Sequence, residues 1–164
     1  MKLNELLLAQ LDRETASTRK ALERVPEGKP DWKPHPKSMP LGYLASLVAT
    51  MFGWTVSMIE RDFLDLASGE RPAASTVADR LALFDKSVAE ARRALADTND
   101  DHLMKPWQLR MGDKVLDEKP RYIMIADTFS HLAHHRGQLS VYLRLNEQKV
   151  PSIYGPTADE GWQG

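Results

Sequence analysis

Two segments of the chain place hydrophobic and polar residues with the period of an amphipathic α-helix. From about Lys2 to Val25, leucines and alanines recur near helical spacing, with charged residues between them. Prolines and a glycine follow directly and predict the end of this first helix. The same pattern runs from about Ser75 or Thr76 to Ala96, and a last helix is predicted from Arg121 to Asn146, with Pro120 at its N-terminal boundary.

A fourth helix is predicted from its apolar character rather than from amphipathicity. It begins near Ser38–Pro40 and runs to about Ala67, before Ser68 and Gly69. Its stretch from Leu41 to Ile59 carries no charge and approaches the length of a membrane span. The hydroxyl residues and glycines within it, and the charges that follow at once, favour a helix buried in a soluble protein.

The predicted fold class is all-α, a four-helix bundle forming a single domain over residues 1–164. Residues 97–119, between the third and fourth helices, break the helical pattern. They contain a loosely alternating stretch and the turn-forming pair Gly112-Asp113, which is typical of either a short hairpin or an ordered loop. The C-terminal segment after Val150 is rich in turn formers and is expected to fold back on the domain.

The composition of the chain indicates which binding partners and which cellular location to expect. The formal net charge is −1, from 22 basic and 23 acidic residues, so neither a nucleic acid nor a membrane surface is an expected partner. The chain has no cysteine, which excludes disulfides, thiolate metal sites and cysteine nucleophiles. The N-terminal residues lack the apolar stretch of a signal peptide, and we expect a cytoplasmic protein.

The candidate chemistry is concentrated on the last predicted helix. His131 and His135 are four residues apart, so both imidazoles lie on one helix face and can share a metal ion. Asp127 lies one turn earlier on this face, and Gln138 and Tyr142 continue it. A buried polar stripe needs partners, which a metal, water or a ligand could supply. The alternative is that the histidines only form hydrogen bonds within the core.

Three runs of the sequence resemble one known family. They are HLAHHRGQ from His131 to Gln138, PSIYGPTADE from Pro151 to Glu160, and KSMPLGYLA from Lys37, followed by Trp54. Together they resemble the DinB-like family, which is related to thiol-dependent transferases and isomerases. The resemblance implies a helical bundle, a homodimer and a divalent metal, zinc or nickel. In that family three side chains hold the metal, two of them at the positions of His131 and His135.

The chain departs from the family pattern at the third ligand. The resemblance implies a histidine on the second helix at a position that is occupied here by Leu47, and an aliphatic side chain cannot bind a metal. Losing a ligand should weaken binding substantially, because even changes outside the ligand set cost roughly 10–100-fold. Asp127 could replace the ligand, and the Met51 thioether could suit a soft ion such as Cu(I).

Other residues have both a functional and a structural interpretation. Arg136 could bind an anionic substrate, although a salt bridge to a neighbouring helix or to a dimer partner is favoured. Tyr154 could donate a hydrogen bond to the site, although anchoring of the tail is favoured. Trp107 and Trp162 are expected to be partly exposed.

Three functions remain open on the sequence. The first is a metal-dependent hydrolase or thiol-dependent transferase that uses an incomplete site at His131 and His135. The second is a metal-free, dimeric small-ligand-binding or stress-response module that has lost catalysis because of Leu47. The third is a bundle that only binds a protein partner. The sequence does not name a substrate.

Overall fold

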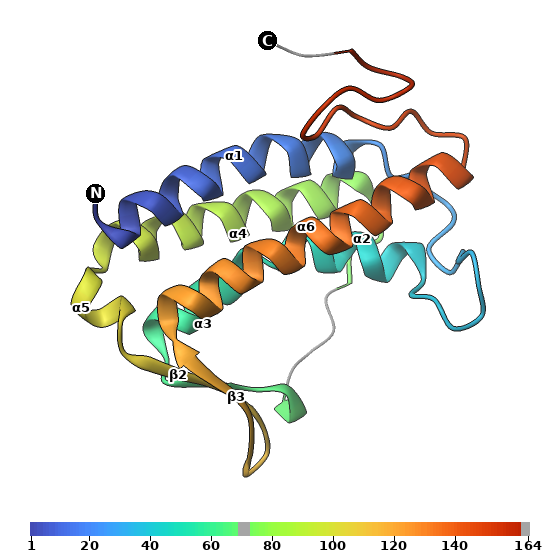
Figure 1. The fold of residues 1–164 in the computed structure, drawn as a ribbon. Helices are drawn as coiled ribbons and strands as arrows, with labels where there is room; N and C mark the ends of the chain where they lie inside the picture. The colour runs from blue at the N-terminus through green and yellow to red at the C-terminus, as the bar shows by residue number, and fades with distance from the viewer. Residues whose placement is uncertain (69–72, 162–164) are drawn as a thin grey trace.

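Long helices packed lengthwise make up most of the molecule, and a small sheet closes one end (Figure 1). This computed structural model describes residues 1–68 and 73–161. The helices there are α1 (Leu3–Glu23), α2 (Leu41–Thr50), α3 (Gly53–Glu60), α4 (Val77–Asp97), α5 (Asp100–Leu103) and α6 (Arg121–Leu145), with a 3-10 turn, η1 (Leu66–Ser68). The strands are β1 (Phe63–Asp65), β2 (Pro106–Met111) and β3 (Lys114–Pro120). The amphipathic periods therefore predicted α1 and α4, and the Pro120 boundary predicted the start of α6, each to within about two residues.

The all-α class is wrong, because the chain also forms a three-stranded mixed sheet in the order β1-β2-β3. The alternative left open for residues 97–119 is decided in favour of a hairpin, in which β2 and β3 pair antiparallel around Gly112. Gly112 has a positive φ of 58°, which glycine adopts at little cost. β1 adds to this hairpin in parallel, with Leu64 opposite Leu109. The predicted second helix, which runs to about Ala67, is therefore wrong over the three residues that form β1.

The second predicted helix is also interrupted, since α2 and α3 are bent by 46° relative to each other. At the break the Thr50 hydroxyl donates back to the Ser46 carbonyl, a local bond that bends helices. The Thr50 carbonyl accepts instead from the Ser87 hydroxyl of α4 at 3.1 Å. A Cβ atom on Gly53 would lie 3.3 Å from that same hydroxyl oxygen, so glycine permits this close approach. The bend thus follows from packing of α3 against α4.

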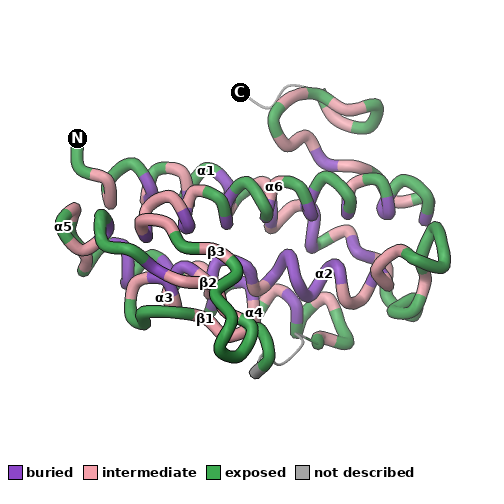
Figure 2. The backbone as a smooth tube through the Cα atoms, turned by 60° about the horizontal axis from the view of Figure 1, so that its bottom comes forward, coloured by how far each residue is buried: buried purple, intermediate pink, exposed green. Residues whose placement is uncertain are grey.

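Within residues 1–68 and 73–161, no single helix is both long and apolar enough to cross a membrane. The bent pair α2 and α3 passes that test only when the two helices are taken together. Seven of the ten α2 residues are buried, and Figure 2 shows the tube coloured as buried along much of this helix. The apolar character of α2 is therefore accounted for by its position inside the protein.

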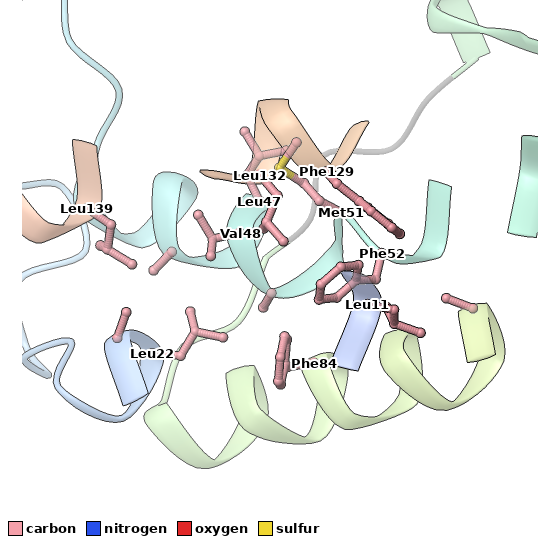
Figure 3. Packing of buried hydrophobic residues seen from close by; sticks show 14 of the residues in the cluster. Leu11, Leu22, Leu47, Val48, Met51, Phe52, Phe84, Phe129, Leu132 and Leu139 are labelled. Atoms are coloured by element: carbon pink, nitrogen blue, oxygen red, sulfur yellow. The ribbon is translucent and has the colours of Figure 1, made fainter. Parts of the chain in front are cut away.

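A continuous hydrophobic core lies between the helices (Figure 3). Phe52 is at its centre, with its ring centroid 6.0 Å from that of Phe84 on α4 and 5.5 Å from that of Phe129 on α6. Trp107 of β2 belongs to the same core and is only 1% exposed, so its predicted partial exposure is wrong. Trp162 lies outside the described residues.

Candidate functional site

The two predicted site histidines lie together on α6. The ring centroids of His131 and His135 are 4.5 Å apart, as expected for residues one helical turn apart. His135 is buried, while His131 is open to solvent on one side and contacts Trp54 of α3 at a centroid distance of 5.7 Å. The pair therefore connects the interior with the surface beside α3.

Gln138 orients the inner histidine. Its side-chain oxygen lies 2.8 Å from Nδ1 of His135, so this amide acceptor holds the ring with the proton on Nδ1. The lone pair of His135 is then on Nε2. The Gln138 amide nitrogen lies 3.0 Å from Nε2 of the exposed His134, which extends the network to the surface. The sequence predicted Gln138 near the site but gave no indication that His134 contacts it.

The surroundings of His131 favour its neutral form. Burial on its inner side lowers the pKa of His131 below the ordinary histidine value, and the neighbouring His135 and His134 lower this pKa further. A neutral imidazole at physiological pH can accept one hydrogen bond and donate another, and it can also ligate a metal.

The residues present do not complete the three-ligand site that the resemblance implies. Leu47 is 6% exposed and Met51 is fully buried, and both belong to the hydrophobic cluster in which Figure 3 labels them. The exposed Asp127 carboxylate accepts from Lys119 Nζ at 3.1 Å on the sheet side of α6. Among all described residues, no group of three histidine or acidic side chains is placed to hold a metal ion. The chain thus provides two imidazoles on α6 and a leucine at the position where the resemblance implies the third ligand.

Arg136 is a buried structural cation. Its side chain is 1% exposed, and its Nη2 lies 2.6 Å from Oε2 of Glu14 on α1, whose side chain is 7% exposed. Nη1 donates to the Thr18 hydroxyl at 2.9 Å. The structure therefore matches the favoured interpretation, a salt bridge to a neighbouring helix. With these partners, the guanidinium does not face an open ligand site.

Tyr154 brings the C-terminal segment to this ion pair. Its hydroxyl lies 2.8 Å from Oε2 of Glu14 and 2.5 Å from Nη2 of Arg136. Burial and the Glu14 carboxylate raise the pKa of the Tyr154 phenol. Further along, Asp159 pairs with Arg144 and Glu160 with Arg24. Tyr154 thus anchors the tail to α1 and α6, which was the favoured interpretation.

An apolar pocket opens beside His131, between α6, α3 and the sheet. Its volume is about 320 Å³. The described residues that line it are Trp54, Met58, Leu64, Leu66, Trp107, Leu109, Asp117, Met124, Asp127, Thr128 and His131. Two predicted site residues, Asp127 and His131, therefore meet at this pocket, whereas the remaining ones do not line it: Leu47, Met51, His135, Arg136, Gln138 and Tyr154. Sequence reasoning missed the pocket because four of its lining residues come from strands whose pairing into one sheet was not predicted.

Comparisons with known proteins agree with the geometry of the fold. The family model for the DinB superfamily matches residues 10–139. This chain belongs to the DinB superfamily, and the predicted family resemblance is confirmed.

Two solved structures share the fold. A DinB-like protein from Bacillus cereus ATCC 10987 is 22% identical, with a TM-score of 0.73 over 92% of this chain and 97% of that one. The DinB-like protein YjoA from Bacillus subtilis is 17% identical, with a TM-score of 0.70 over 90% of this chain and 97% of that one. No match was found among curated proteins.

Proposed function

We propose that this DinB-superfamily protein binds a small molecule with an apolar body in the pocket beside His131 and does so without the divalent metal of its family. The observation that carries the proposal is Leu47. This side chain is buried among hydrophobic residues where the family resemblance requires a ligand, and no described donor replaces it. The His131 imidazole, which lines the pocket, is then available to a ligand as a hydrogen-bonding group, while His135 is buried and bonds to Gln138.

The pocket has the character of a small-molecule site. Such sites are concave, have volumes of roughly 300–1,000 Å³, and combine apolar walls with a few polar groups. Here a pocket of about 320 Å³ is lined mainly by tryptophan, leucine and methionine, with His131 and two carboxylates among its polar groups. The His131 imidazole, whose pKa is lowered, would meet a ligand in its neutral form.

Elemental analysis of tag-free protein tests the metal-free part of this proposal. The protein is incubated with zinc, nickel, manganese or copper salts, desalted and analysed. We expect far less than one metal per chain in the natural protein and close to one zinc or nickel in Leu47→His, with Leu47→Asn as a polar control of similar size. Close to one metal per chain in both the natural protein and Leu47→His would refute the proposal.

A second candidate function is a metal-dependent hydrolase or thiol-dependent transferase. It is favoured by the hydrogen bond from His135 Nδ1 to Gln138, because metal-binding histidines are commonly oriented by such a partner on the second ring nitrogen. About one metal per natural chain, lost in both His131→Ala and His135→Ala, would establish this candidate instead. A homodimer and a cytoplasmic location remain predictions, and light scattering of the purified protein measures the first.

A further inference from the structure

The charged groups on the pocket wall are acidic. Among the described lining residues, Asp117 and Asp127 are acidic, none is a lysine or arginine, and the pKa of the one histidine, His131, is lowered. Thr128 is already satisfied, since its hydroxyl donates to the Met124 carbonyl at 2.9 Å. A ligand entering between these groups therefore meets carboxylate oxygens and apolar surface, which disfavours an anion and favours a cation.

One lysine outside the lining partly balances this charge. Lys119 Nζ lies 3.0 Å from Asp117 and 3.1 Å from Asp127, and the two carboxylates together raise the pKa of Lys119. The three groups sum to a formal charge of −1. Each carboxylate also keeps lone pairs beyond those that Lys119 uses, because an ionised carboxylate offers about four acceptor positions.

Two tryptophans add a second feature that suits a cation. Trp54 and Trp107 both line the pocket. The Trp107 Nε1–H donates to the Ser57 carbonyl at 3.3 Å, so this indole has no donor left for an anionic ligand. Indole rings attract cations within about 6 Å through their π-face. Carboxylates beside indole rings in an apolar cavity form a setting for an ammonium group attached to a hydrocarbon body.

We propose that the ligand of this pocket is a cationic amphiphile, a molecule with an aromatic or aliphatic body and a protonated amine that lies near Asp117 and Asp127. This inference rests on the proposed small-molecule function, and it assigns the chemical class of the ligand. The body occupies the space among the leucine, methionine and tryptophan side chains. The ammonium group donates to the carboxylates at the wall formed by β3 and α6.

Three probes with one carbon skeleton separate the class of ligand from binding itself. Phenethylamine is a cation, 2-phenylethanol is neutral and phenylacetate is an anion at pH 7, and calorimetry or protein NMR titration measures each dissociation constant. We expect phenethylamine to bind about tenfold more tightly than the alcohol, and phenylacetate to bind more weakly than both. A tenfold ratio is within reach of one or two charge interactions near a protein surface.

Two substitutions of opposite sign test where the amine lies. Asp127→Asn should weaken phenethylamine binding about three- to tenfold and leave 2-phenylethanol unchanged, because it removes one nearby charge. Lys119→Met should strengthen phenethylamine binding by a similar factor, because it removes the competing cation. Asp113→Asn, in the exposed hairpin turn, changes the net charge equally away from the pocket and should have no effect.

The outcomes distinguish the two proposals. Equal affinity for the amine and the alcohol, with resonance shifts at the pocket residues, would overturn the amine assignment and leave the small-molecule function standing. Tighter binding of phenylacetate than of phenethylamine would do the same. If none of the three probes binds up to millimolar concentration, both the amine assignment and the proposed function fail.

Discussion

The buried ion pair between Arg136 and Glu14 should be one of the main determinants of stability. Arg136→Met removes the charge and keeps a long apolar side chain. It leaves the Glu14 carboxylate, 7% exposed, without its cation, while the Tyr154 hydroxyl still donates to it at 2.8 Å. Breaking a buried pair from one side typically costs about 3–5 kcal/mol, because a charge stays buried without compensation.

Urea unfolding, followed by tryptophan fluorescence and by circular dichroism, measures this cost. With an m value of roughly 2 kcal/mol/M, a loss of about 4 kcal/mol lowers the midpoint by about 2 M. The double variant Glu14→Leu/Arg136→Met should lose much less than the sum of its single variants, because neither charge is then left unpaired. Arg93→Met is the control, since this arginine is 65% exposed and lies 3.8 Å from its acidic partner.

Additive free energies in this cycle, or a cost below about 1 kcal/mol for Arg136→Met, would refute the structural role of Arg136. If Arg136→Met does not fold, Tyr154→Phe gives a milder test. It removes the hydroxyl that contacts both charged groups and leaves the ion pair in place. We expect about 1.5–3 kcal/mol from this change, which is the usual range for hydrogen bonds to charged groups.

Two further predictions concern the tail and one helix cap. Arg144 lowers the pKa of Asp159 and Arg24 lowers that of Glu160, so their stabilisation is complete above the unfolded values of 3.8 and 4.5 and is lost as pH falls through the lower folded values. The protection factors of amides in residues 150–161, taken relative to the intrinsic exchange rate at each pH, should therefore fall at acid pH before those of α6 do, and simultaneous loss of protection would contradict this. Thr76→Ala removes the side chain that caps α4 and should cost about 1 kcal/mol in urea unfolding, with no change contradicting the cap.

Helices and strands are predicted accurately from the sequence when their position depends on local patterns alone. Helices α1, α4 and α6 are long and amphipathic or bounded by proline, so each was located within about two residues. β1 could not be found this way, because three residues form a strand only by pairing in parallel with β2, more than forty positions later. The break between α2 and α3 was missed for a related reason. The break depends on Ser87 of α4. Its hydroxyl donates to the Thr50 carbonyl of α2, and Gly53 has no side chain to prevent the close approach of this hydroxyl.

The same distinction applies to the candidate site. Helical spacing alone placed His131 and His135 together, and the structure gives their rings a separation of 4.5 Å. The partner of Arg136, in contrast, lies 122 residues away on α1, and no local pattern identifies it. The pocket was equally hidden, because Trp54 of α3 and Trp107 of β2 reach it from elements that are distant in sequence.

Leu47 connects the stability of this protein with its proposed independence from metal. A leucine buried to this degree contributes about 1.5–3 kcal/mol through removal from water, whatever the metal supply. A histidine there would lose that contribution and regain stability only when a metal binds, by about 2.7 kcal/mol at a metal concentration 100 times the dissociation constant. We therefore expect Leu47→His to melt below the natural protein in chelator and to gain about 5–10 °C with zinc, at roughly 2–4 °C per kcal/mol for a chain of this size. The natural protein should melt at the same temperature in both conditions, and an equal zinc-dependent gain in the natural protein would show that its two histidines bind the metal without a third ligand.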